Sequence, residues 1–390
     1  MDRRNHNSQF ELASAIKGDM RTSADVLAAI LLWLPPSSRQ LARLVCRRWR
    51  DVVDTRTTEM QSRAKPLVVT DAGSVHVVDD LSTGCHRVLW NGIPRDLPHE
   101  RRNVIVGTCN GLICLCDNRK VDGAITVINP VTGEKLSLPP LLSTTGSPGS
   151  GYIVGWHEEY GFGYHPTTGR HKVVHVAAYD RKGNSHQVKV FTLGESSWRD
   201  VATGSVPRCQ YSAGIVGVNG TMYWAAKRGR KLMALDLDHE SLSFIKSLLD
   251  VSPGSWNLTE VRGRLGVVFY SFPHQCEVWV LEGAATVREH TWSRWYIVRR
   301  DISSPRTWQL TRPHFAHREY LLTEELYDGC GGPRNVVYKH KPNSDSGMVE
   351  ISETSPGTRV LTIKAALPNH CQTFAYVETT EPLSVYKCCS

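Results

Sequence analysis

The protein is a chain of 390 residues, of which 41% are hydrophobic and 22% charged, and its formal net charge is +8. The basic excess lies mainly in residues 1–65, which carry 12 basic and 7 acidic residues, so the nearly neutral remainder excludes a broad nucleic-acid footprint. The longest apolar run, Val26–Leu34, is much shorter than the roughly 20 residues of a bilayer span. The polar first twenty residues do not form a secretory signal, so we expect a cytoplasmic or nuclear protein that does not enter the membrane.

The eleven cysteines are odd in number and scattered along a long chain. Without a secretory signal they are expected to be reduced thiols. Cys114 and Cys116 form a C-x-C, and Cys388 and Cys389 lie next to the end, but no second Cys/His pair follows either group at ligand spacing. We therefore expect no metal site and no cofactor.

The N-terminal part of the chain predicts helices. Residues 1–20 lack periodicity and are predicted to be a disordered tail. Thr22 and Asp25 form a [ST]-x-x-[DE] capping box before a helical run that Pro35 and Pro36 end. A second helix is predicted from an apolar stripe at helical spacing, and no third helix is evident before the β-rich region. The stripe comprises Leu41, Leu44, Val45, Trp49, Val52 and Val53.

Both predicted helices are strongly apolar, yet together they span only some thirty residues. A unit of this size is marginal alone, so its apolar surface needs cover from the rest of this chain or from another protein. Cys46 is predicted to be a small buried hydrophobe. The arginines on the other side are interpreted as a solvated face rather than a nucleic-acid recognition helix; they are Arg43, Arg47, Arg48 and Arg50.

After Lys65 and Pro66 the pattern changes to short runs rich in Val, Ile, Tyr, Phe and Trp, separated by turn residues. No amphipathic helix interrupts these runs. They predict an all-β repeat architecture. The runs are PLVVT, SVHVVDD, NVIVGT, LICLC, AITVINP, HKVVHVAAY, QVKVFTL, TMYWAA, KLMALDL, LGVVFYSF, CEVWVL, RWYIVRR and NVVYKH.

Short sequence motifs that recur along the chain indicate the size of the repeat. The sequences CNGLICL, VNGTMYW and VRGRLGV each place a turn glycine before an apolar strand. These glycines are Gly111, Gly220 and Gly263, and along the sequence the first two are about two repeats apart and the last two about one repeat apart. The sequences NPVTGE (129–134) and HPTTGR (165–170) each predict a turn between two strands. A unit of roughly 40–55 residues is the size of a four-stranded propeller blade. We expect about six blades, with five to seven possible, and a flexible loop over residues 143–151.

The helical segment DVLAAILLWLPPSSRQLARLVCRRWRDVV resembles the F-box motif of plant F-box proteins. The double proline and the V-C-R-x-W-R sequence carry this resemblance. The echoes N-P-x-T-G-E and V-N-G-x-x-Y-W resemble the F-box-associated, kelch-like region that often follows. The resemblance implies a small all-α F-box over residues 21–64, followed by an all-β propeller over residues 65–390.

What the resemblance implies for function is a non-catalytic substrate receptor of an SCF-type ubiquitin ligase. The F-box would bind a Skp-family adaptor and, through it, cullin, while the propeller would capture a target protein of unknown identity. The adaptor-binding residues expected from the motif are Val26, Leu27, Ile30, Leu31, Leu34, Pro35, Leu41, Val45, Cys46 and Trp49. The chain departs from the family at Thr22 and Ser23, where Leu-Pro is usual, and at Arg39 and Gln40. These departures motivate the alternative of a non-ligase interaction scaffold with a degenerate F-box.

Other candidate sites are weaker. His171 and His175 are four residues apart, but on a strand they would lie about 13 Å apart, too far to share one ion; His314 and His317 are equally weak. No catalytic motif of a hydrolase or nucleotide-binding enzyme is present, and we expect no catalytic residue. The tryptophans are predicted to pack between blades rather than to bind a target; they are Trp198, Trp224, Trp256, Trp279, Trp292, Trp295 and Trp308. Target-binding residues are unknown.

Overall fold

A computed structural model divides the chain into two compact units, Met1–Glu59 and Met60–Ser390. The predicted tail, residues 1–20, and the predicted loop, residues 143–151, lie outside the described residues. The structure describes residues 23–56, 64–70, 73–91, 103–120, 122–141, 155–166, 168–177, 187–202, 209, 213–226, 231–246, 255–271, 275–282, 291–301, 308–329, 332–344, 346–352, 356–364 and 371–387.

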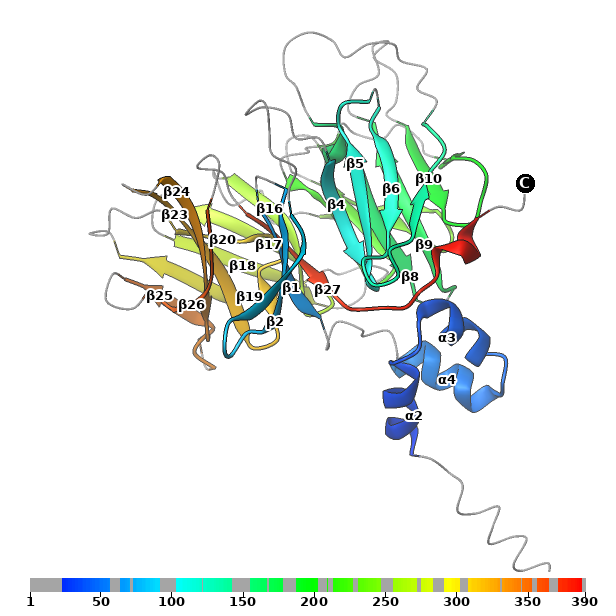
Figure 1. Ribbon diagram of the computed structural model, residues 1–390, viewed down its shortest axis with the longest axis horizontal. Coiled ribbons are helices and arrows are strands. Elements are labelled where there is room, and N and C mark those ends of the chain that lie inside the picture. The colour runs from blue at the N-terminus through cyan, green and yellow to red at the C-terminus, as the bar shows by residue number, and fades with distance from the viewer. Residues whose placement is uncertain are drawn as a thin grey trace, which may run out of the picture. The chain divides into compact units, whose positions relative to one another are not determined.

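The described part of the first unit holds three helices, drawn in blue in Figure 1. They are α2 (Ala24–Leu31), α3 (Pro36–Ala42) and α4 (Arg47–Arg56). The prediction of two helices is therefore wrong in one respect, because the second predicted helix is broken into α3 and α4. The first prediction is confirmed, since α2 ends before the two prolines.

The described part of the second unit forms six sheets, which we number as blades 1 to 6 in chain order. Blade 1 contains β1 (Lys65–Val69), β2 (Val75–Asp80), β3 (Cys85–Trp90), β21 (Arg312–Pro313) and β27 (Gln372–Tyr376). Blade 2 contains β4 (Asn103–Cys109), β5 (Leu112–Asp117), β6 (Ala124–Ile128) and β7 (Lys135–Ser137). Blade 3 contains β8 (Tyr160–His165), β9 (Arg170–Val176), β10 (Val188–Thr192) and β11 (Arg199–Asp200), with the short helix η2 (Trp156–Glu159) before it.

The remaining blades follow in the same order. Blade 4 contains β12 (Ile215–Val218), β13 (Thr221–Ala225), β14 (Lys231–Asp236) and β15 (Leu242–Lys246). Blade 5 contains β16 (Ser255–Val261), β17 (Arg264–Ser271), β18 (Gln275–Glu282), β19 (Thr291–Arg300) and β25 (Met348–Ile351). Blade 6 contains β20 (Trp308–Leu310), β22 (Ala316–His317), β23 (Tyr320–Gly329), β24 (Gly332–His340) and β26 (Thr358–Lys364). A last helical turn, η5 (Leu383–Tyr386), follows β27.

These sheets confirm the predicted all-β propeller of six blades built on four strands each. Every β-rich run named above coincides with a strand. The ring is closed in blade 1, where the early strand β1 pairs antiparallel with the late strand β27, with Leu67 opposite Phe374 (Figure 1). Blade 5 gains its fifth strand from the segment after β24, because β25 pairs parallel with β19, with Ile297 opposite Met348.

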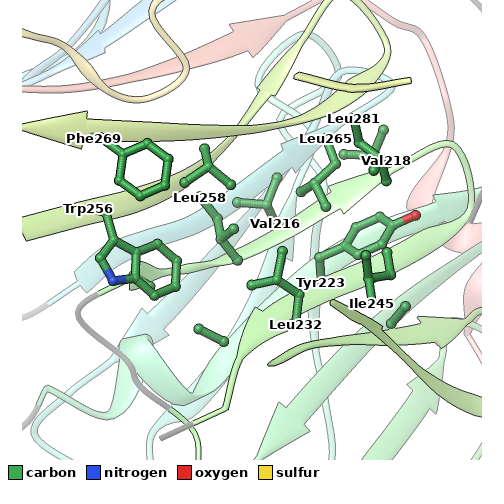
Figure 2. Close-up of a cluster of buried hydrophobic side chains, with 14 residues drawn as sticks. Val216, Val218, Tyr223, Leu232, Ile245, Trp256, Leu258, Leu265, Phe269 and Leu281 are labelled. Atoms are coloured by element: carbon green, nitrogen blue, oxygen red, sulfur yellow. The ribbon is translucent and has the colours of Figure 1, made fainter. Parts of the chain in front are cut away.

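The core of the propeller lies between the blades. Each hydrophobic cluster joins residues of two neighbouring sheets, and one cluster joins Val68 of blade 1 to Leu322 of blade 6, which completes the ring. Figure 2 shows the cluster between blades 4 and 5, where Val216 and Tyr223 face Trp256 and Leu265. Burying one such side chain is worth roughly 1.5–3 kcal/mol, so stability is distributed around the whole ring.

Candidate functional site

Helix α2 is capped by Ser23, whose hydroxyl accepts a hydrogen bond from the backbone N–H of Asp25 at 3.3 Å. Asp25 adds a negative charge in the first turn, which favours the helix dipole. The predicted capping box placed the cap one residue earlier, at Thr22, which lies outside the described residues. The cap observed is Ser23, because its oxygen reaches the second N–H of the helix.

The break between α3 and α4 falls at residues 43–46. The backbone N–H of Leu44 bonds to the carbonyl of Leu41 at 3.0 Å, and that of Val45 to Ala42 at 3.2 Å. Such three-residue bonds tighten the last turn of a helix and end it. A new helix, α4, then begins, and the carbonyl of Cys46 accepts a hydrogen bond from the backbone N–H of Arg50 at 3.1 Å. No glycine or proline marks this break, so the apolar spacing predicted one continuous helix.

A small core lies among the three helices. The buried apolar side chains are Leu27, Ala28, Leu31, Ala42, Val52 and Val53. Ala24, Leu34 and Trp49 pack against this cluster and are partly buried. Leu27 and Leu31, which the sequence analysis assigned to adaptor binding, therefore lie in the core of the unit and are not exposed on its surface.

Six large apolar side chains of the unit remain exposed, by 52–77%. They form two groups: Val26 and Ile30 lie four residues apart on α2, with Trp33 in the turn just after it, whereas Leu41, Leu44 and Val45 lie at the end of α3 and in the turn that follows. The described part of the chain contains ten exposed large hydrophobic residues, and six of them fall in this short segment. We call these six residues the apolar surface. Such a concentration is typical of an interaction site.

Four of these six residues belong to the predicted adaptor-binding set: Val26, Ile30, Leu41 and Val45. Sequence reasoning missed Trp33 and Leu44, although the spacing of Trp33 from Val26 and Ile30 carried the signal. Leu34, Pro35 and Trp49 are half-buried. Cys46 is exposed, so the prediction of a buried residue is wrong, because the residue lies in the turn rather than on the inner side of a helix.

The basic residues divide by position. Arg47, Arg48 and Arg50 are exposed, which confirms the predicted solvated face. Arg43 is half-buried and donates to Oε1 of Gln40 at 3.4 Å. Arg39 is buried, with 3% of its surface exposed. Because Arg39 is buried and Gln40 half-buried, both side chains stay largely enclosed in the helical unit.

The weaker sequence candidates have structural partners in the propeller. His171 and His175 both lie on β9, as predicted, and are buried. Nε2 of His175 is 2.9 Å from Oε2 of Glu159, and Nδ1 of His171 is 3.3 Å from the hydroxyl of Tyr386. Nδ1 of His314 lies 3.4 Å from Oε2 of Glu260. Among the residues that the structure describes, no group of three His, Cys, Asp or Glu side chains could hold a metal ion.

The C-x-C pair lies in β5, where both thiols are buried in the cluster between blades 2 and 3. Burial raises the pKa of Cys116 to about 12 and raises that of Cys114 as well. A thiol that stays protonated is a poor nucleophile and a poor ligand. These two cysteines therefore act as core residues.

The tryptophans pack as predicted. Trp224 and Trp256 are buried between blades, and Nε1 of Trp198 donates to the carbonyl of Pro139 at 2.9 Å. The other predicted tryptophans lie against the clusters that flank blade 5; they are Trp279, Trp292, Trp295 and Trp308. Within the described ranges, no helix is long and apolar enough to cross a membrane.

Two families match this chain. Residues 23–58 match the F-box domain, and residues 88–318 match the F-box associated beta propeller domain. F-box protein At3g07870 of Arabidopsis thaliana is 22% identical over 343 residues, which cover 74% of this chain and 75% of that protein. F-box/kelch-repeat protein At3g23880 of the same plant is 23% identical over 299 residues, or 69% of this chain and 77% of that protein. A chain in a crystal structure of a nidogen/laminin complex has a TM-score of 0.42 and 11% identity over 81% of this chain and 99% of its own length.

Proposed function

Because the chain belongs to the family with an F-box associated beta propeller domain and carries an F-box domain before it, we propose that it is a substrate-recognition subunit of an SCF-type ubiquitin ligase. The F-box, assigned to residues 21–64, docks on a Skp-family adaptor and through it on cullin. The propeller, assigned to residues 65–390, captures a target protein. On this proposal the chain works in the cytoplasm or the nucleus, and other subunits transfer the ubiquitin.

The observation that carries this proposal is the apolar surface on the helical unit. The small core of Leu27, Leu31, Val52 and their neighbours holds the helices together without using Val26, Ile30, Leu41 or Val45. Each of these side chains can lose exposed area only by meeting another surface. Full burial of one is worth roughly 1.5–3 kcal/mol, so several together supply a stable interface once association costs are met.

The test is binding of the purified full-length protein to a Skp-family adaptor. Val45→Asp places a charge in the proposed interface and should weaken binding about tenfold or more, since an unpaired charge is costly to bury. Val131→Asp is a matched control, because Val131 is 49% exposed on the propeller and Val45 is 63% exposed on the F-box. A folded protein that binds no adaptor, or equal loss in both variants, would contradict the proposal.

A second candidate function is a non-ligase scaffold with a degenerate F-box. The observation that favours it is Ser23, which caps α2 at the position where the family has proline. The double substitution Thr22→Leu with Ser23→Pro discriminates between the two candidates. A large gain in adaptor binding would favour the scaffold, whereas unchanged tight binding would favour the receptor.

A further inference from the structure

The segment that follows β27 does not end at the sheet. It continues through residues 377–387 and finishes in η5 beside blade 2 (red in Figure 1). On its way it passes over the hairpin turn of β4 and β5. Gly111 in that turn has φ +86°, and a Cβ there would overlap the carbonyl oxygen of Val377 and the side chain of Thr379. The turn therefore needs glycine partly because the segment lies directly on it.

Asn129, the first residue of N-P-V-T-G-E, binds the same segment. Its buried side-chain amide donates to the carbonyl of Thr379 at 3.1 Å and to the carbonyl of Glu381 at 2.8 Å. Its side-chain oxygen accepts the backbone N–H of Val131 at 2.9 Å. One asparagine thus shapes its own turn and holds two alternate carbonyls of an extended chain. Both hydrogens of the amide are thus spent on main-chain carbonyls of the segment, which fixes its register on the turn.

Glu134, the last residue of the motif, provides the complementary acceptor. Its Oε2 accepts the backbone N–H of Leu383 at 2.9 Å and the hydroxyl of Thr132 at 3.1 Å. Leu383 itself is buried in the cluster between blades 2 and 3. The turn therefore binds two carbonyls and one N–H of the segment, while the side chain of Leu383 anchors the segment in the neighbouring cluster.

The end of the segment is fixed by an aromatic contact. The hydroxyl of Tyr386 donates to Oε1 of Glu381 at 2.6 Å, and its ring meets the buried ring of His171 edge-on at 5.9 Å. His171 belongs to β9, so the segment reaches blade 3 as well. It starts from β27 in blade 1 and consequently touches three successive blades.

The related turn H-P-T-T-G-R differs at the two decisive positions. His165 replaces the asparagine, and its Nδ1 accepts the backbone N–H of Thr168 at 3.2 Å within its own turn. An imidazole cannot donate two hydrogens from one nitrogen. Arg170 replaces the glutamate and offers no acceptor. The shared Pro-x-Thr-Gly frame makes the turn, whereas Asn129 and Glu134 add the binding groups.

We propose that the turn Asn129–Glu134, together with Gly111, is a docking site for an extended peptide, which the chain's own residues 377–387 occupy as a clasp. The site takes a peptide with two accessible carbonyls two residues apart, followed by leucine and tyrosine. By holding this segment, the site locks blade 1 to blades 2 and 3 and supports ring closure beyond the pairing of β1 with β27. This proposal does not depend on adaptor binding.

The test is hydrogen–deuterium exchange of the full-length protein, read peptide by peptide. Asn129→Ala removes both donors and should speed exchange across residues 379–387 about tenfold or more, since one hydrogen bond is worth about that factor in an equilibrium constant. Exchange in β27 and β1 should also rise. Val131→Ala is the control in the same turn, because Val131 is exposed and contributes only its backbone N–H.

Unchanged exchange in residues 379–387 would overturn the docking site. Faster exchange that stays confined to those residues, with β1 and β27 unaffected, would overturn the clasp. Glu134→Ala covers the case in which Asn129→Ala does not fold, because Glu134 lies nearer the surface and its loss should still speed exchange at the amide of Leu383. Wild-type exchange at that amide in a folded Glu134→Ala protein would also contradict the proposal.

A second measurement tests peptide recognition directly. In full-length protein, Leu383→Ala with Tyr386→Ala weakens the occupant but leaves the receiving turn intact. A fluorescent synthetic peptide of residues 377–387 should bind this variant saturably and bind the wild type more weakly, because the native segment competes at high effective concentration. Adding Asn129→Ala should abolish binding. Equal peptide binding with and without Asn129 would overturn the assignment.

Discussion

Nδ2 of Asn219 donates a 2.7 Å hydrogen bond to the carbonyl of Gly263, so the first hairpin of blade 4 is tied to the first hairpin of blade 5. Both turns have two residues at positive φ, 45° and 80° at Asn219 and Gly220, and 50° and 77° at Arg262 and Gly263. Turns of this shape match the twist of paired strands and favour glycine at the second position. The glycines that recur in the sequence therefore mark the first hairpins of blades 2, 4 and 5, and the hairpins of the neighbouring blades 4 and 5 are in contact.

A pair of glycine substitutions separates backbone strain from close packing. Gly111→Ala and Gly133→Ala both place alanine at positive φ, but a Cβ at Gly133 meets nothing, whereas one at Gly111 overlaps the C-terminal segment. Gly133→Ala should lower the free energy of unfolding by about 1–2 kcal/mol from strain alone. Gly111→Ala should lower it by about 2–5 kcal/mol, because overlap adds to strain. Urea titrations of the two variants provide the comparison, and equal losses would show that the segment does not press on Gly111.

Local pattern was sufficient to predict the all-β propeller and most of its central strands, because these strands are continuous apolar runs such as LICLC and their hairpins carry glycine. Local pattern was insufficient where the strands that pair lie far apart in the sequence. β25 joins blade 5 through residues about fifty positions from β19, and β27 reaches back to β1 across the whole unit. The outer strand β3 was also missed, since four of its six residues are exposed and form no apolar run.

The candidate site was predicted only in part, for a geometric reason. Leu41, Leu44 and Val45 share a stripe with Val52 and Val53 only if one helix runs through all five residues. The break at residues 43–46 separates them, so Val52 and Val53 enter the core while the other three stay exposed. Spacing alone identifies an apolar side and cannot say which residues it buries.

A substitution in the core of the helical unit should lower its stability, whereas a substitution on the apolar surface should weaken adaptor binding directly. Leu31 is completely buried, so Leu31→Ala should destabilise the unit by about 2–5 kcal/mol and reduce adaptor binding indirectly. The melting transition of the propeller should not move, since its clusters are separate from the helical core. Calorimetry, together with hydrogen–deuterium exchange of residues 24–56, checks both expectations. A shifted propeller transition would contradict the division into two cores.

Thiol modification should report on the apolar surface. Cys46 and Cys85 are exposed, whereas burial raises the pKa of Cys116 and Cys276 to about 12. Iodoacetamide should therefore modify Cys46 and Cys85 well before the buried thiols, as read site by site with mass spectrometry. A Skp-family adaptor should slow modification of Cys46 and leave Cys85 unchanged. Equal rates at Cys46 with and without a bound adaptor would place the interface elsewhere.

Acid should weaken the propeller through two buried histidines of blade 6. Burial lowers the pKa of both His317 and His340 from 6.5 to about 4, and Nε2 of His340 lies 2.7 Å from the hydroxyl of Thr323. Between pH 6.5 and pH 4 the unfolded chain binds a proton at each site while the folded chain does not, so stability falls as pH falls through this range. Each histidine should remove about 1–2 kcal/mol between pH 6.5 and pH 5.

The measurement is the free energy of urea unfolding at several pH values in that range. Carboxylates whose pKa the fold lowers, such as Glu240 beside Lys172 and Arg199, lose their contribution mainly below about pH 5, where the unfolded carboxylates take up protons, so the slope is read between pH 6.5 and pH 5. His340→Gln should flatten the pH dependence, since the unfolded chain then has one proton fewer to gain. His239→Gln is the control, because that side chain is 75% exposed. A slope unchanged by His340→Gln would show that the buried imidazole does not set the acid response.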